Sequence, residues 1–204
     1  MTESARAGLC DAYRRLGRLG LIQGSSGNLS TRTWDGMLIS PSGMTPEHIE
    51  PAHLIATTLD SPALNASSEW ALHAGLYNDN PAIGAVVHTH ADACTALSCL
   101  AEPLPPFHYM VASFGGDNVR CAPYATFGTP ALAELAIEAM RGRTACLLAN
   151  HGMIAAGPTL EDALATTLRL ETLARQFLQA RSAGPPRLLT PEQMAVARER
   201  YLTY

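Results

Sequence analysis

The 204-residue sequence predicts an α/β layered fold, and two observations support this prediction. Apolar segments with the length and β-branched content of buried strands alternate along the chain with longer segments of helical periodicity. The chain is also long enough to bury one full hydrophobic core, and its 47% of hydrophobic residues is an ordinary value for a globular protein. Because we find no internal repeat and no low-complexity segment, we expect residues 1–204 to form a single domain.

The N-terminal third should begin with a helix. Leu9, Tyr13 and Leu16 recur at helical spacing within residues 4–19, and Gly20 follows them as a typical helix end. The other elements expected in this third are a turn or ligand loop over residues 24–30, short strands over 37–40 and 54–59, a loop over 60–66, and a helix from about 68 to the residues before Asn80-Pro81.

The central and C-terminal parts give clearer signals. Residues 83–90 are apolar, contain two adjacent valines and should form a central strand, and residues 144–149 should form a second buried strand. A short helix is expected to end near Leu100, and three further helices should begin at Thr129-Pro130, Thr159 and Thr190-Pro191. Asp162 would form a weak capping box with Thr159, and Gln193 would form one with Thr190. Residues 184–186 resemble a linker, but the tail that follows is too short for a second domain.

Composition and charge narrow the functional classes. The net charge is −4 without a basic stripe, which argues against nucleic acid as a partner, and no apolar run approaches the length of a membrane span. Residues 1–11 lack the basic segment and apolar core of a secretory signal, so we expect a cytoplasmic protein. Only 16% of the residues are charged, a low value that favours the burial of some surface between subunits.

The cysteines are expected to be buried free thiols in a reducing compartment. Their number is odd and none forms a CxxC pair, so we do not expect zinc held by cysteine. They are Cys10, Cys94, Cys99, Cys121 and Cys146.

The pair His88 and His90, at the end of the strand expected over 83–90, carries the strongest chemical signal. Side chains alternate between the faces of a strand, so both imidazoles point the same way and could share one metal ion, although an isolated pair of this kind is also common by chance. His151 follows the strand expected over 144–149, again where a buried strand opens into a loop. If the two strands lie side by side, three histidines converge and leave zinc with an open coordination position, which is typical of a catalytic site.

Three segments of small or polar residues are candidates for binding an anion. Ser67-Ser68-Glu69 lies at a predicted helix start, where hydroxyls and free backbone N–H groups suit a phosphate, although a simple capping motif explains the same residues. Glu69 could equally be a partner of the helix dipole. The other two segments are residues 24–28 and 41–43, and neither has the glycine pattern of a Walker loop or a dinucleotide fingerprint.

Taken together, these segments resemble class II aldolases of the L-fuculose-phosphate aldolase type, in a family that also includes L-ribulose-phosphate 4-epimerase and the adducin head domain. The matching segments, in the family's order and over nearly the whole chain, are residues 26–30 (SGNLS), 41–43 (PSG), 67–70 (SSEW), 86–90 (VVHTH), 108–110 (HYM), 115–116 (GG), 121–129 (CAPYATFGT) and 151–152 (HG). The resemblance implies a three-layer α/β/α fold around a central, largely antiparallel sheet.

The resemblance also implies roles for individual residues. One zinc ion per chain, or another divalent metal, would be bound by His88, His90 and His151. Glu69 would be the catalytic carboxylate and would approach the metal when substrate is absent. The phosphate of the substrate would contact Asn28, Ser42, Gly43, Ser67 and Ser68. Tyr109 from a neighbouring subunit and Tyr204 would complete the site in a homotetramer with active sites at subunit interfaces, although Tyr204 is the last residue here and family members usually continue beyond it.

The other histidines are expected to play smaller parts. His48 and His53 lie in a segment that we expect at the surface, so both should be solvated. His73, one helical turn after Glu69, should be structural, and His108 should orient the loop that carries Tyr109.

The implied reaction is the cleavage of a ketose 1-phosphate into dihydroxyacetone phosphate and an aldehyde. Breaking the bond between C3 and C4 leaves negative charge at C3, which must spread into the C2 carbonyl as an enediolate. The chain contains no lysine, since all fourteen basic residues are arginines, so a Schiff-base mechanism is excluded and a Lewis acid such as zinc must hold this charge. Glu69 would move the proton at C3, and Tyr109 would exchange a proton with the C4 oxygen.

Three alternatives remain open at this point. A pentulose-phosphate 4-epimerase uses the same metal and the same retro-aldol step, but relatives of that type carry aspartate where this chain has Glu69. A keto-acid phosphate decarboxylase would release carbon dioxide in place of an aldehyde. A non-catalytic adducin-like binding module is disfavoured, because such domains tend to lose the zinc histidines. The aldehyde end of the substrate also stays open between L-fuculose 1-phosphate and the 5-deoxy- or 5-methylthio-pentulose 1-phosphates.

Overall fold

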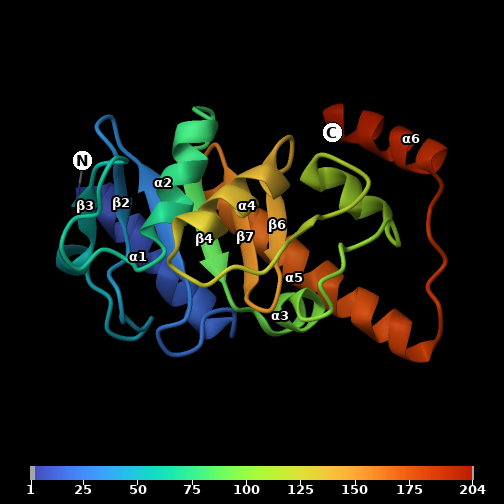
Figure 1. Ribbon diagram of the computed structural model, residues 1–204, viewed down its shortest axis with the longest axis horizontal. Helices are drawn as coiled ribbons and strands as arrows, with labels where there is room; N and C mark the ends of the chain where they lie inside the picture. Colours follow the sequence, from blue (N-terminus) through green and yellow to red (C-terminus); the bar gives the residue numbers. More distant parts are fainter. Residues whose placement is uncertain (1–2, 204) are drawn as a thin grey trace.

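The computed structural model describes residues 3–203, apart from the side chain of Leu202 (Figure 1). The α-helices are α1 (Glu3–Arg18), α2 (Trp70–Asp79), α3 (Asp92–Ser98), α4 (Pro130–Met140), α5 (Leu160–Ala183) and α6 (Pro191–Leu202). The 3-10 helices are η1 (Pro51–His53) and η2 (Tyr109–Phe114). The strands are β1 (Asn28–Arg32), β2 (Met37–Ile39), β3 (Ile55–Thr57), β4 (Ala85–Thr89), β5 (Cys121–Ala122), β6 (Ala145–Leu148) and β7 (Gly152–Gly157).

The strands form one sheet in the order β3-β2-β1-β4-β7-β6-β5. Every neighbouring pair is antiparallel except β5 and β6, which are parallel. The central strand β4 lies between β1 and β7, and its His88 is opposite Asn28 on one side and Ile154 on the other. The largely antiparallel sheet implied by the resemblance is confirmed.

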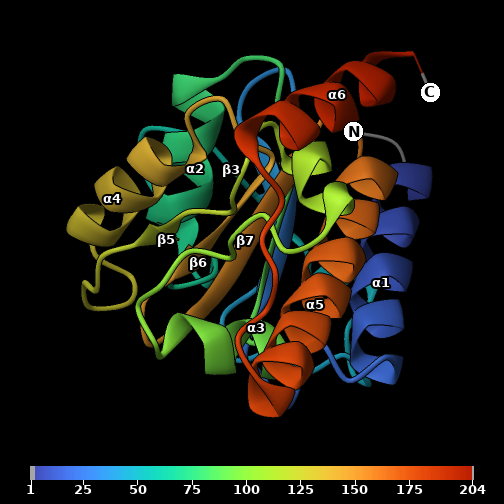
Figure 2. The ribbon, with the colours of Figure 1, turned by 90° about the vertical axis from the view of Figure 1, so that its right-hand side faces the viewer.

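Helices cover both faces of the sheet and give the molecule three layers, as Figure 2 shows from the side. The helices α2 and α4 pack on one face, and α1 and α5 pack on the other. In β4, Val86 belongs to the core under α2 and α4, whereas Ala85 and Val87 belong to the core under α1 and α5. Since side chains alternate along a strand, His88 shares the face of Val86 and points toward the α2 side.

The threonines expected to begin three helices do so. Thr129, Thr159 and Thr190 each accept a hydrogen bond from the backbone N–H three residues further on. Gln193 completes a capping box with Thr190. At Thr159 the expected capping box is replaced by a hydrogen bond from the threonine hydroxyl to the Asp162 carboxylate.

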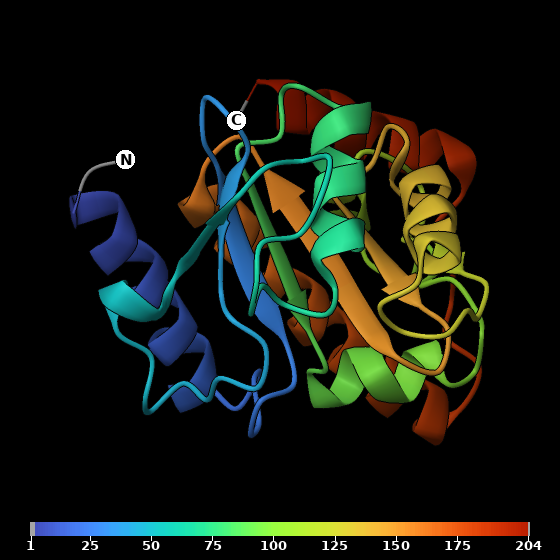
Figure 3. The same cartoon turned by 60° about the vertical axis from the view of Figure 1, so that its left-hand side comes forward.

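Three strands differ from the sequence-based expectation. Part of the sheet can be followed in Figure 3, where β1 (blue), β4 (green) and β7 (orange) lie side by side. Residues 24–30 were expected to be a turn or ligand loop, but their last three residues belong to β1, where the fully buried Leu29 pairs with β4. The strands β5 and β7 were not expected, because β5 has only two residues and β7 is rich in glycine and alanine. Burial of all of β7 between β4 and β6 outweighs its low strand propensity. The two predicted histidine strands, β4 and β6, are therefore not neighbours.

The free thiols differ in exposure. Cys10, Cys94 and Cys146 are buried as expected, but Cys99 is exposed at the end of α3 and Cys121 is half-buried on the edge strand β5. In the part of the chain that the structure describes, we find no helix with the length and apolar character needed to cross a membrane.

Candidate active site

His88 is fixed in the sheet by the neighbouring strand. The side chain is almost fully buried, and its Nδ1 donates a hydrogen bond to the carbonyl oxygen of Met153 on β7, at 2.9 Å. This bond holds the proton on Nδ1 and leaves Nε2 free to act as a ligand. The Nε2 atom of His90 lies 3.0 Å from this free nitrogen.

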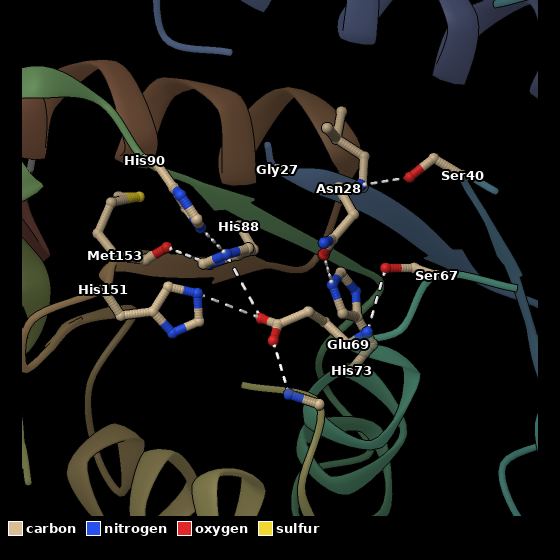
Figure 4. A network of polar contacts seen from close by, with 12 residues as sticks. Gly27, Asn28, Ser40, Ser67, Glu69, His73, His88, His90, His151 and Met153 are labelled. Atoms are coloured by element: carbon tan, nitrogen blue, oxygen red, sulfur yellow. Dashed lines mark hydrogen bonds and ion pairs between the residues drawn. The ribbon is translucent and has the colours of Figure 1, made fainter. Parts of the chain in front are cut away.

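His90 and His151 complete a compact cluster with His88 (Figure 4). One ring nitrogen from each of the three histidines lies within 4.8 Å of the other two. The ring centroids are 4.7 to 4.9 Å apart, with interplanar angles between 70° and 83°. His151 reaches the cluster from the turn between β6 and β7, so the three histidines converge even though β4 and β6 are not adjacent.

The turn that carries His151 is held from two sides. The backbone N–H of Asn150 donates to the Ser98 carbonyl of α3, and the backbone N–H of His151 donates to the Ser98 hydroxyl. On the other side, Gly152 has no room for a side chain, because a Cβ there would lie 2.5 Å from the carbonyl oxygen of Thr89. The turn therefore fixes His151 against the end of β4.

Glu69 is brought to the histidines by α2, which it directly precedes. Its Oε1 accepts a hydrogen bond from the Gly128 N–H at 2.9 Å. Its Oε2 lies 3.4 Å from His88 Nε2 and 3.7 Å from His151 Nε2, and this buried oxygen has no hydrogen-bond partner among the described residues. A buried, unpartnered carboxylate oxygen beside three imidazole nitrogens fits a divalent metal ion.

The electrostatics of the site favour neutral imidazoles. Burial, reinforced by the neighbouring histidines, lowers the pKa of His88 well below its ordinary value. Burial and then His90 lower the pKa of His151 to about 4, and burial lowers the pKa of His90. Burial raises the pKa of Glu69, against the opposing effect of the Gly128 N–H. Because the lowered pKa values keep His88 and His151 neutral, their contacts with Glu69 are not ion pairs at neutral pH. The neutral imidazole is also the form that binds a metal.

A cavity of about 420 Å³ opens onto this cluster. Its polar lining includes Ser26, Asn28 at the start of β1, and Ser68 before α2. It is also lined by the aromatic residues Tyr124 and Phe127, which are largely exposed. The cavity thus combines hydrogen-bonding groups and aromatic surface beside the histidines, which suits a small polar ligand that also carries an apolar part.

Comparison with known proteins identifies the family. Residues 7–178 match the family described as the class II aldolase and adducin N-terminal domain. The chain belongs to this class II aldolase and adducin family. The three histidines and Glu69 lie within the matched region.

Several proteins of the family are similar to the chain over almost its whole length. A 5-methylthioribulose-1-phosphate/5-deoxyribulose-1-phosphate aldolase of Rhodospirillum rubrum is 44% identical, over 98% of this chain and 91% of the relative. An L-fuculose phosphate aldolase of Escherichia coli K12 is 40% identical, over 96% of this chain and 93% of the relative. A solved structure of an L-fuculose 1-phosphate aldolase superimposes with a TM-score of 0.93 and 34% identity, covering 99% of this chain and 98% of that one.

In this class II aldolase fold, the residues expected to contact phosphate fall into two groups. Asn28 and Ser68 line the cavity, whereas Ser42, Gly43 and Ser67 are not among its lining residues. The Ser67 hydroxyl accepts a hydrogen bond from the Glu69 N–H within the turn that leads into α2. Ser42 and Gly43 are exposed in a turn whose Pro41 pairs with Ala66 beside them, so this turn adjoins the start of α2.

Tyr109 does not line the cavity of its own chain. Its side chain is 56% exposed and lines a separate cavity with residues of α5 and α6, among them Arg169 and Val196. Its ring stacks on His108, whose Nδ1 accepts the Met110 N–H, so His108 orders this segment as expected. Tyr204 lies outside the described residues.

Sequence reasoning assigned no role to four residues that line the cavity, which are Tyr124, Ala125, Phe127 and Asn150. Tyr124 and Phe127 belong to a segment that carried the family resemblance without receiving a role. Asn150 lines the cavity and adopts a positive φ of 55°, and its only signal in the sequence was its place directly before His151. The predicted structural role of His73 is supported by its full burial, while His48 and His53 are exposed as expected.

Proposed function

We propose that this chain is a metal-dependent class II aldolase, an aldehyde-lyase that cleaves a ketose 1-phosphate into dihydroxyacetone phosphate and an aldehyde. The observation that carries the proposal is the meeting of three neutral histidines and a buried glutamate at one cavity. The absence of lysine from the sequence excludes the Schiff-base route to the same reaction. The aldolase names of the relatives from Rhodospirillum rubrum and Escherichia coli support the same activity.

Zinc is the metal we assign to His88, His90 and His151. Three neutral nitrogen ligands leave zinc an open position for substrate. The unpartnered Glu69 Oε2 lies close to two of these ligands, His88 and His151. When bound, the metal ion supplies Lewis-acid stabilisation of the negative charge that develops on the substrate oxygens.

Glu69 is the residue we assign to the proton at C3. Its Oε1 is held by the Gly128 N–H, so Oε2 is the oxygen free to take and return a proton. Burial raises the pKa of this carboxyl, which brings it closer to neutral pH and makes proton transfer in both directions easier.

The two ends of the substrate are assigned to different residues of the cavity lining. Asn28 and Ser68 hold the phosphate, with Ser67 and the turn at 42–43 adjoining them. The aldehyde end lies against Tyr124 and Phe127. This apolar surface favours a 5-deoxy- or 5-methylthio-pentulose 1-phosphate, and L-fuculose 1-phosphate, which also ends in a methyl group, is the alternative.

Each active site is shared between subunits of a homotetramer in this proposal. Tyr109 is exposed and does not line the cavity of its own chain, which supports its use in a neighbouring subunit. There it exchanges a proton with the C4 oxygen as the aldehyde forms. Tyr204, the last residue of the sequence, is assigned as a second tyrosine of the shared site.

We further propose that residues 1–204 act as one class II aldolase-like domain in the cytoplasm. The free cysteines, three of them buried, support a reducing compartment.

A panel of ketose 1-phosphates tests the proposed function. Each compound is incubated with the purified protein, and dihydroxyacetone phosphate and the aldehyde are measured separately. Release of both products in equal amounts from at least one of the 5-deoxy, 5-methylthio or L-fuculose compounds is expected. Interconversion of pentulose phosphates without free aldehyde, or release of carbon dioxide from a keto-acid phosphate, would replace the aldolase with the epimerase or the decarboxylase.

A further inference from the structure

A buried chain of hydrogen bonds runs from Tyr77 to Asn28 behind the wall of the cavity. The Tyr77 hydroxyl lies 2.8 Å from Ser30 Oγ, and Ser30 Oγ lies 2.7 Å from His73 Nδ1. His73 Nε2 lies 2.5 Å from Asn28 Oδ1, the contact drawn in Figure 4. Ser30 and His73 are fully buried and Tyr77 is 1% exposed, while Asn28 lines the cavity at the end of the chain.

The protons in this chain can run in only one direction if each buried donor is to have an acceptor. Burial lowers the pKa of His73 to about 3, so its ring is neutral and carries a single N–H. The Tyr77 hydroxyl has no acceptor other than Ser30 Oγ within residues 3–203. Tyr77 must therefore donate to Ser30, because a buried hydroxyl without an acceptor is unfavourable.

The remaining members of the chain follow from that first bond. The Ser30 oxygen accepts from Tyr77, so its own proton goes to His73 Nδ1. The single proton of the His73 ring is then on Nε2, and it is donated to Asn28 Oδ1. The amide oxygen of Asn28 is thus engaged, and its NH₂ group is the part left for a ligand.

We propose that Tyr77, Ser30 and His73 are positioning residues that turn the Asn28 amide so that it offers hydrogen-bond donors to the cavity. An asparagine amide can present either its oxygen or its NH₂ group, and the two differ in what they bind. With the NH₂ group presented, position 28 favours an oxyanion, whereas the amide oxygen would repel one. This inference rests on the proposed function, in which Asn28 holds the substrate phosphate.

The position of Asn28 gives this orientation its importance. Asn28 lies directly opposite His88 in the pairing of β1 with β4, so the amide is next to the metal ligands. His73 is on α2, one turn after Glu69, and its backbone N–H donates to the Glu69 carbonyl oxygen. One helix therefore carries both the proposed base and the residue that sets the phosphate donor.

Two substitutions at His73 separate the orienting bond from a general loss of packing. In His73→Gln, the amide nitrogen can occupy the place of Nε2 and still donate to Asn28. In His73→Asn, the shorter amide reaches only the place of Nδ1, so Ser30 keeps a partner and Asn28 loses its donor. Both replacements are polar and neutral, and thermal unfolding of the two proteins reports how much stability each one loses.

The expected result is that the KM for the ketose 1-phosphate is roughly ten-fold higher in His73→Asn than in His73→Gln, with a smaller difference in kcat, because one hydrogen bond to a charged group is lost. Equal KM values in the two variants, whatever their stability, would overturn the inference.

A second measurement needs no substrate and keeps the inference separate from the proposed function. The ¹⁵N chemical shifts of histidine-labelled wild-type protein distinguish a neutral ring with its proton on Nε2 from one with its proton on Nδ1. We expect the Nε2–H form for His73, and the Nδ1–H form would overturn the relay. If no ketose 1-phosphate is cleaved, the proposed function fails while this measurement still decides the orientation.

Discussion

The Oε2 atom of Glu69 lies 3.4 Å from the Nε2 atom of His88, which carries no proton because the single proton of the neutral His88 ring is on Nδ1. Both atoms are buried, and the Glu69 oxygen has no hydrogen-bond donor among the described residues. The lone pairs of a buried carboxylate oxygen and a buried imidazole nitrogen repel each other unless a cation or a proton lies between them. The pair therefore marks the point where a metal ion and a transferable proton are both expected.

Replacing Glu69 by glutamine should remove the proposed base while keeping the shape of the side chain. Turnover should fall by roughly two to four orders of magnitude, and proton exchange at C3 of dihydroxyacetone phosphate should disappear. Glu171→Gln is a matched control, since Glu171 is the other buried glutamate of the described residues and accepts the N–H groups of Ala93 and Cys94 instead. Exchange at the wild-type rate in Glu69→Gln would remove Glu69 from the proposed role.

Replacing Gly152 by alanine should disturb the turn that places His151. The added Cβ would lie 2.5 Å from the Thr89 carbonyl oxygen and 3.3 Å from the His90 backbone, so β7 must shift away from the end of β4. We expect a loss of about 1–3 kcal/mol in the free energy of unfolding and a lower metal content. Gly8→Ala in α1, where a Cβ meets no atom within 4 Å, is the control and should stabilise the protein by about 0.5–1 kcal/mol. Normal metal content and stability in Gly152→Ala would contradict the fixed turn.

The sequence allowed the chemistry of the site to be predicted better than its geometry. The period of two along β4 placed His88 and His90 on one face, and the structure confirms this because both lie in the cluster. The convergence of His151 was predicted for a wrong reason, the direct pairing of β4 with β6. The strand between them, β7, has small residues of low strand propensity, and only its burial by neighbours on both sides makes it a strand.

Contacts between distant segments account for most of what could not be predicted. The approach of Gly128 to Glu69 joins residues 59 positions apart, and the bond from His73 to Asn28 spans 45 positions. Neither leaves a local pattern in the sequence. The helix starts at Thr129 and Thr190, by contrast, depend on side chains within one turn, and these were predicted correctly.

Mixing two inactive variants should restore activity if the site is shared between subunits. Glu69→Gln chains keep Tyr109, and Tyr109→Phe chains keep Glu69, so a mixed ring contains some sites with both residues. Equal mixing should make about a quarter of the sites complete, because each chain has one neighbour in each direction. The measurement is the rate of dihydroxyacetone phosphate release after co-expression. No recovery in proven mixed oligomers, or a monomeric mass by light scattering, would rule out a shared site.

Acid should destabilise the protein partly through His73. Its pKa is about 3 in the folded chain and about 6.5 when unfolded, so the unfolded state binds the extra proton as the pH falls below 6.5. Above pH 6.5 this histidine does not change the free energy of unfolding, and at pH 5 it should lower that free energy by about 2 kcal/mol. The free energy of urea unfolding at pH 7.5 and pH 5, at one protein concentration, should fall less in His73→Gln than in the wild type. An identical fall in the two proteins would contradict the buried neutral histidine.

Metal removal and return is the measurement that tests the central claim most directly. Dihydroxyacetone phosphate release is followed in the purified wild type, after chelation, and after zinc is restored, with metal content determined at each stage. We expect about one metal ion per chain, loss of activity with the metal, and recovery of both, whereas His151→Ala should regain neither. A metal-free wild-type protein that cleaves the ketose 1-phosphate at an undiminished rate would contradict the account.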